Sequence, residues 1–275
     1  MKSPDFDNYH ICMKKVCRFI CGLLSATFAF SVLSYGSATN QLFLDLVPQT
    51  RDSMSDSVGV AKPGVNPATG TWKYKTRIVQ PDGTYTSASS MTIKDNGNSW
   101  TATTTFESSD GAVTDDSTLE KGTLFLREES FKHFAKPGRP WSVTIQLKFS
   151  DSKVTGSSNR VNGHDKVVEV DLSGPLISKA MIGFLPLANG YSTTVRTWDV
   201  QVLKERHLQV KVIGMEKVTV AAGRFDAYRL ELTPAEGGSD KETIWIARDS
   251  HMTVKASQVE VLGGGTSITN SELVP

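Results

Sequence analysis

The side chains best able to do chemistry in this sequence are histidines and two acidic doublets. A zinc site gathers several His, Cys, Asp or Glu ligands, often two of them from one short segment. The histidines beyond the N-terminal region are each isolated, without an HExxH or HxH spacing, and we expect surface or turn positions for them: His133, His164, His207 and His251. The sequence therefore predicts no metal site and no cofactor.

Motifs for nucleophilic catalysis and phosphate binding are missing as well. A serine hydrolase of the α/β type carries a GxSxG turn after a strand, and the chain has none. The glycines at 263–265 are not followed by the Lys and Ser or Thr of a phosphate-binding loop, so they indicate a flexible linker.

The acidic doublets are Asp115 with Asp116 and Glu128 with Glu129. Adjacent residues on a strand point to opposite faces, so the two members of one doublet cannot act together. General acid and base catalysis would need a pairing between distant parts of the chain, which the sequence does not reveal. We therefore expect a protein that is not an enzyme and has no catalytic residues.

The N-terminal segment has the pattern of a secretory signal. Basic residues at 14–18 precede an uncharged run at 19–35, and the small residues Gly36 and Ala38 then stand at the spacing that signal peptidase requires. We predict a signal peptide over residues 1–38, cleavage after Ala38, and an exported protein that is periplasmic or extracellular.

Three alternatives concern this same segment. The apolar run is near the lower limit of the roughly 17–25 residues of a transmembrane helix, so an uncleaved anchor stays open. A chain starting at Met13 would have a more ordinary basic region, because Asp5 and Asp7 precede it. A lipid anchor is not expected, because Cys21 stands at the start of the apolar run and has no lipobox before it.

Cleavage would remove every cysteine, since all three lie before Ala38: Cys12, Cys17 and Cys21. The mature chain would then fold without disulfides, although export permits them. The formal net charge of +1 would become about −1, because four basic and two acidic residues leave with the signal. Balanced charge argues against nucleic acid as a partner and against a polybasic membrane patch. A small or neutral partner fits better, with no stable membrane insertion after cleavage.

The mature chain divides by pattern into three parts. Residues 39–69 are rich in Ser, Asp, Pro and Gly and indicate a flexible lead-in, although the apolar patch at 42–47 could dock on the domain. Residues 70–262 show short runs of alternating apolar and polar side chains separated by polar turns, which is typical of antiparallel strands. Residues 263–275 are expected to be a flexible tail.

Alternation is clearest at 141–149, where Trp, Val, Ile, Leu and Phe occupy every second position. Helical spacing occurs once, at Ile177, Ala180, Met181 and Phe184, and Pro186 and Gly190 keep that segment short. The fold class that follows is mainly β, a curved antiparallel sheet or open half-barrel with one short helix.

Residues 218–255 contain VAAGRFDAY at 220–228 and TIWIARD at 243–249, followed by Val254 and Lys255. This segment resembles the DUF3108 family of bacterial envelope proteins, with weaker support from GTWKYK at 70–75 and LPLANGY at 185–191. The resemblance implies a curved sheet like that of lipoprotein-localisation factors, whose better-known members hold acyl chains or other apolar ligands.

By that analogy we expect an apolar or lipid-like ligand in the concave face of the sheet, with 177–191 as a lid. The candidate ligand-binding residues, each also a candidate for ordinary core packing, are Met181, Phe184, Leu185, Leu187, Tyr191, Trp198 and Trp245. The alternative function is a structural or protein-interaction module of the cell envelope.

Overall fold

A computed structural model of the 275-residue chain describes residues 62–108, 111–135, 142–159, 166–200, 202–238, 240–262 and 265–275. The predicted signal peptide, the lead-in as far as residue 61, the apolar patch at 42–47 and His164 lie outside these residues. Those predictions therefore stay predictions.

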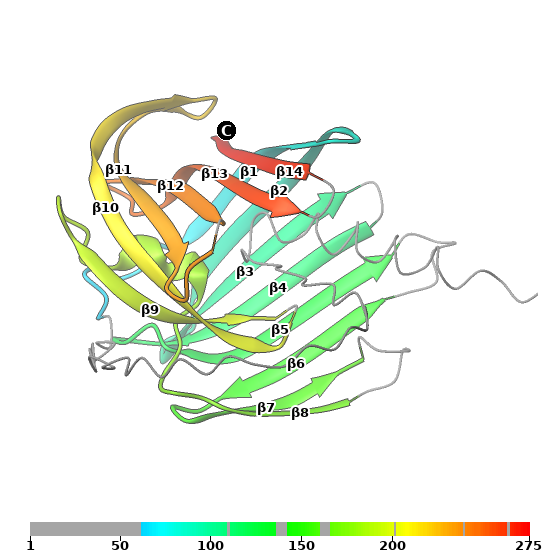
Figure 1. Ribbon diagram of the computed structural model, residues 1–275. Helices are drawn as coiled ribbons and strands as arrows, with labels where there is room; N and C mark the ends of the chain where they lie inside the picture. The colour runs from blue at the N-terminus through cyan, green and yellow to red at the C-terminus, as the bar shows by residue number, and fades with distance from the viewer. Residues whose placement is uncertain are drawn as a thin grey trace, which may run out of the picture.

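The described chain forms one antiparallel sheet of fourteen strands and one short 3₁₀ helix (Figure 1). The strands are β1 (Gly70–Gln80), β2 (Gly83–Asp95), β3 (Ser99–Ser108), β4 (Gly111–Glu120), β5 (Leu126–Ala135), β6 (Val143–Phe149), β7 (Lys153–Ser158), β8 (Lys166–Asp171), β9 (Ser192–Asp199), β10 (Lys204–Val220), β11 (Gly223–Pro234), β12 (Lys241–Ala247), β13 (Thr253–Leu262) and β14 (Gly265–Val274). The helix η1 spans Lys179–Phe184. The mainly β fold class is confirmed.

The order of strands makes the sheet an open half-barrel. The first and last strands, β1 and β14, pair in its middle, whereas β8 and β9, which follow each other in the chain, form its two edges. The sheet is not closed, because in the described structure β8 and β9 do not pair with each other. Figure 1 shows the sheet curling so that β9–β12 come to face β3–β6.

The alternation read from the sequence determines which face is buried. Every second residue of β6 is buried, from Val143 to Phe149, and β1 buries Tyr74 and Ile78 on the same principle. These inward side chains form the concave face of the sheet and one large hydrophobic cluster. A second cluster lies between η1 and β9–β12 and includes Ile182, Leu185 and Ile246.

The segment between β8 and β9 packs into the concave side. Leu126 donates its backbone N–H to Leu176 O at 2.8 Å, and Ile177 N–H donates to Arg196 O at 2.9 Å. This segment therefore hydrogen-bonds to both β5 and β9. The short helix predicted from spacing at 177–184 is confirmed over Lys179–Phe184 as the 3₁₀ helix η1, which makes two turns and buries Met181 and Phe184.

The predicted boundary at residue 263 is wrong. Residues Gly265–Val274 form β14, which pairs with both β13 and β1, so the predicted flexible tail is a central strand. Gly265, predicted as part of a linker, begins this strand and adopts φ of 128°. Strand β10 is long and continues through a β-bulge between Val212 and Gly214.

Candidate functional site

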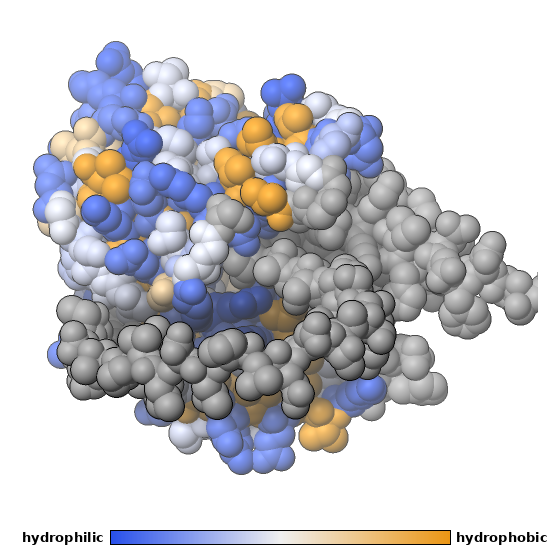
Figure 2. All heavy atoms as spheres, in the orientation of Figure 1, coloured by the Kyte–Doolittle hydropathy of each residue, from blue (hydrophilic) through white to orange (hydrophobic). Residues whose placement is uncertain are grey.

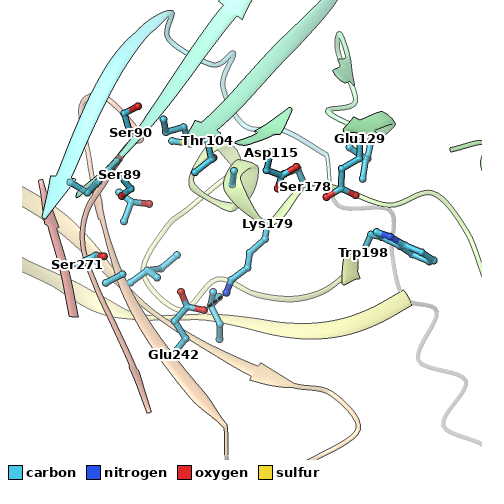
Figure 3. Close-up of a pocket in the computed structure, with 18 residues that line it drawn as sticks. Ser89, Ser90, Thr104, Asp115, Glu129, Ser178, Lys179, Trp198, Glu242 and Ser271 are labelled. Carbon is cyan, nitrogen blue, oxygen red and sulfur yellow. Dashed lines mark ion pairs between the residues drawn. The ribbon is translucent and has the colours of Figure 1, made fainter. Parts of the chain in front are cut away.

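A cavity of about 110 Å³ lies on the concave side of the sheet (Figure 3). Strands β1–β5 supply one wall, β11–β14 supply the other, and residues 178–180 at the start of η1 and Trp198 of β9 complete the lining. Its larger apolar side chains are Tyr74, Met91, Leu126, Trp198, Leu232 and Ile244. The lining also has six Ser and Thr hydroxyls and four charged groups, so the cavity is both polar and apolar: Ser89, Ser90, Thr104, Ser178, Thr253, Ser271, Asp115, Glu129, Lys179 and Glu242.

Asp115 and Glu129 form a pair of carboxyls within this cavity. They come from neighbouring strands, where Asp115 stands opposite Phe131 and Glu129 stands opposite Ser117, which makes the two acids diagonal neighbours on the inner face. Their side chains are only 7% and 8% exposed and share a hydrogen bond. A hydrogen bond between two carboxyls requires that one of them holds a proton.

The surroundings keep that proton on the pair near neutral pH. Burial, followed by the charge of Asp116, raises the pKa of Asp115 to about 7, against the hydrogen bond from Glu129 that acts in the other direction. Burial also raises the pKa of Glu129 well above its ordinary value, and the charges of Asp115 and Asp199 add to that effect. The pair therefore titrates as a unit.

The second charged feature of the cavity is an ion pair between Lys179 of η1 and Glu242 of β12. Both side chains are largely buried, at 14% and 6% exposure, so the pair joins the helix to the opposite wall of the cavity. Near the end of η1, the backbone oxygen of Gly183 lies 2.9 Å from Nδ1 of His251, and the ring of His251 stacks on Phe184. These contacts hold η1 over the inner face.

Several buried polar atoms that line the cavity find no hydrogen-bond partner among the described residues. They are the hydroxyls of Tyr74 and Ser89, the indole Nε1 of Trp198 and one oxygen each of Asp115 and Glu129. A buried polar atom left unpaired costs roughly 1–3 kcal/mol. Their convergence on one space is what distinguishes this cavity from ordinary core packing.

Of the seven predicted ligand-binding residues, Trp198 lines this cavity. Met181, Phe184, Leu185 and Leu187 are buried and pack within the two hydrophobic clusters instead. Tyr191 is partly buried against the second cluster. The segment predicted as a lid contributes Ser178, Lys179 and Ala180 to the lining. Ser178 and Lys179 are polar, so apolar spacing did not single them out.

Trp245 cannot line the cavity, because it occupies the opposite face of β12. Ile244 lines the cavity, and its neighbour on the strand must point outward. There the indole Nε1 of Trp245 donates to Glu216 Oε1 at 2.5 Å, and Lys255 Nζ lies 5.6 Å from the ring centroid.

The surface or turn positions predicted for the histidines hold only in part. His133 is 2% exposed and faces the concave side from β5, so its prediction is wrong, because it shares the inward alternation of Glu129 and Phe131. His251 lies in the turn between β12 and β13. His207 lies within β10 rather than in a turn, and is partly exposed.

A Ser, Glu and His cluster at the edge of the sheet has the wrong order for nucleophilic catalysis. Glu205 accepts hydrogen bonds from the backbone and hydroxyl of Ser173, and its Oε1 lies 2.7 Å from His207 Nε2. Burial alone would raise the pKa of Glu205, but the Ser173 and His207 contacts outweigh it and lower that pKa. A catalytic triad needs the histidine between the hydroxyl and the carboxylate, whereas here the carboxylate is central. The cluster fixes the start of the segment that enters the concave side.

Among the described residues, no group of three His, Cys, Asp or Glu side chains is arranged to hold a metal ion. The one helix they contain, η1, is too short to cross a bilayer.

Comparison with known proteins agrees with this architecture. A family model described as a protein of unknown function (DUF3108) matches residues 71–269, and no curated protein sequence matches the chain. The chain resembles the crystal structure of a β-barrel-like protein of the DUF1849 domain of unknown function from Brucella abortus, with a TM-score of 0.54 and 11% identity over 76% of this chain and 97% of that one. It also matches a putative exported protein with a YmcC-like fold from Bacteroides fragilis, with a TM-score of 0.28 and 13% identity over 78% and 97% of the two chains. The first likeness shows the fold alone.

Proposed function

The chain belongs to the DUF3108 family, and we propose that it is an exported, non-catalytic protein that binds an apolar or lipid-like ligand on the concave face of its half-barrel. The observation that carries this proposal is the set of buried, unpaired polar atoms around the cavity, above all Trp198 Nε1 and the Ser89 hydroxyl. Apolar walls with a few convergent polar groups are the usual composition of a small-molecule site.

The size of the cavity limits what enters it. A dry cavity of roughly 150 Å³ accommodates benzene, so about 110 Å³ takes a polar end group with a few carbons rather than a whole acyl chain. The ligand is therefore an amphiphile whose polar end is inserted. Met91, Leu126 and Ile244 offer apolar contacts beside the hydroxyls that would receive that end.

The test compares two substitutions on β13: one places a large side chain inside the cavity, and the other places the same side chain on the outer face of the sheet. Ala256 lines the cavity from β13, and Ser257 follows it on the outward side. Saturable shifts of the Trp198 indole N–H resonance on titration with 1-butanol are expected for the wild type and for Ser257→Phe, but not for Ala256→Phe. A Trp198→Phe variant assigns the resonance.

Two results would contradict the proposal. One is the absence of any saturable shift in the wild type, and the other is equal binding by the Ala256→Phe variant. Mass spectrometry of lipid released from protein purified gently from its own cells adds an independent readout, in which a stoichiometric amphiphile is expected.

A second candidate function, protein interaction in the cell envelope, is favoured by apolar residues on the outer face. Val259 and Ile268 are cross-strand partners on β13 and β14, each 38% exposed, and Val261 nearby is 55% exposed. Figure 2 shows hydrophobic side chains scattered among hydrophilic ones on the face in view. If this face binds a protein, cross-linking in intact cells should give one adduct of defined mass that is lost on Val259→Lys and retained in Ala256→Phe.

A further inference from the structure

The charges around the cavity do not balance. Four charged side chains line it, and Lys179 is already paired with Glu242. The Asp115 and Glu129 pair is left without a basic partner within the cavity lining. In Figure 3 these two carboxyls lie near Trp198, toward β4 and β5, whereas the ion pair lies toward β12.

The ionisable groups around the pair but outside the lining include Asp199, Arg206 and His133. Asp199 lies close enough to Glu129 to add to its negative surroundings. The basic group near Asp199 is Arg206, whose Nε lies 3.6 Å from Asp199 Oδ2, so this arginine faces a carboxylate of its own. His133 stands on the same inward row of β5 as Glu129, four residues along.

The carboxyls also have free hydrogen-bonding capacity directed at the cavity. Asp115 Oδ1 and Glu129 Oε2 have no partner among the described residues, although both side chains are more than nine-tenths buried. Thr104, the cross-strand partner of Asp115, lines the cavity beside them. Independently of the acids, the Trp198 indole is 7% exposed, lines the same space and has an unpaired Nε1.

We propose that the cavity selects a ligand with a protonated amine, whose ammonium group is held between Asp115 and Glu129 while its apolar part contacts Trp198, Leu126 and Met91. This inference rests on the proposed function and specifies the chemical class of its ligand. An ammonium carries three donors and no acceptor, which matches two carboxyls and the Thr104 hydroxyl as acceptors. A carboxylate or phosphate end would instead face two acids, because Lys179 is already engaged.

Binding of the cation should release a proton. The two carboxyls hold at least one proton in the free protein near neutral pH, and an ammonium stabilises the doubly ionised pair because it supplies the opposite charge. Affinity for an amine should therefore increase as the pH rises from 5 to 8, whereas affinity for an alcohol of the same length should change little.

The experiment compares three probes of equal length: butylammonium, 1-butanol and butyrate. Each is titrated into the full protein while the Trp198 indole resonance is followed. A charge-assisted hydrogen bond contributes roughly 1.5–3 kcal/mol, so butylammonium should bind roughly ten- to a hundredfold more tightly than 1-butanol at pH 8, and butyrate should bind most weakly.

The two acidic doublets provide matched controls. Asp115→Asn and Glu129→Gln should weaken butylammonium binding much more than 1-butanol binding and so remove most of the preference for the amine. Asp116→Asn and Glu128→Gln change the adjacent residue on the outward face and should retain the preference. Thermal unfolding of each variant shows whether it is folded at the temperature of the titration.

The outcomes separate the two proposals. If 1-butanol binds but butylammonium does not bind more tightly, or if the inward and outward variants behave alike, the amine inference is wrong and the proposed function stands. If none of the three probes shifts the Trp198 resonance, the proposed function fails and the inference fails with it.

Discussion

Replacing Asp115 with Asn should make the protein less sensitive to alkaline pH. Burial and the charge of Asp116 raise the pKa of Asp115 from 3.8 in the unfolded chain to about 7 in the native state. The native state thus holds a proton that the unfolded chain has lost. The stabilising effect is complete below pH 3.8 and disappears as the pH rises through 7.

The magnitude follows from the two pKa values. Between pH 5 and pH 8, this one carboxyl should lower the free energy of unfolding by about 2.5 kcal/mol. For a domain of this size, that corresponds to a fall in Tm of roughly 5–10 °C. Glu129 should add a loss in the same direction, because burial raises its pKa as well.

The assay is urea unfolding at pH 5 and pH 8 for the wild type, Asp115→Asn and Asp116→Asn. The decrease from pH 5 to pH 8 should be smaller in Asp115→Asn than in the wild type by at least about 2.5 kcal/mol, because the substitution also removes a charge that raises the pKa of Glu129. The Asp116→Asn variant should keep most of the decrease. Equal decreases in the wild type and Asp115→Asn would refute the reasoning, because they would mean that Asp115 is ionised in the native state at pH 5.

Three further predictions concern the helix and the N-terminus. Lys179→Met should destabilise the protein by about 3 kcal/mol, because Glu242 is left buried without its partner; adding Glu242→Gln should recover most of the loss, as measured by thermal unfolding. Gly183→Ala should displace η1, since a Cβ there would overlap the backbone carbonyl oxygen of His251; faster hydrogen exchange at η1 and at the β12–β13 turn would show it, and unchanged exchange would contradict it. N-terminal sequencing of the mature protein should begin at Thr39, and an intact N-terminus in the membrane fraction would favour the anchor.

Alternation made the strands and their buried faces predictable. In β6 and β1, one hydrophobic face is enough to set the orientation of every side chain. The same rule misled at the C-terminus, because β14 has mostly polar residues on its buried face, including Ser267, Thr269 and Ser271. Ser271 faces Thr76, and their hydroxyl oxygens lie 2.5 Å apart. Polar residues that pair across strands in this way give no apolar periodicity, so the sequence resembled a tail.

The cavity was less predictable than the fold for a related reason. The predicted binding residues were large and apolar, and such side chains pack efficiently in hydrophobic clusters, as Met181 does in the first cluster and Leu185 in the second. A cavity persists where polar groups prevent that packing. The informative signal was therefore a polar residue at an inward position of a strand, such as Ser89 on β2 or Asp115 on β4.

A β-bulge decides which member of the second acidic doublet enters the cavity. Leu119 pairs with Leu126 but Thr118 pairs with Glu128, so Arg127 is an extra residue on β5. Leu126 points inward, and without the bulge strict alternation would direct Glu128 inward as well.

Because of the extra residue, the next side chain after Leu126 that points inward is Glu129, which is 8% exposed, while Glu128 is exposed. Arg127 is held in its position by Glu120 and by Asp151, to which its guanidinium donates at 2.7 Å. Glu128 and Glu129 look equivalent in the sequence. The contact of Arg127 with Glu120 on the outer surface holds the bulge in place, and the bulge determines that Glu129 is the one that points into the cavity. Asp115 therefore has a carboxyl partner only because the register changes at Arg127.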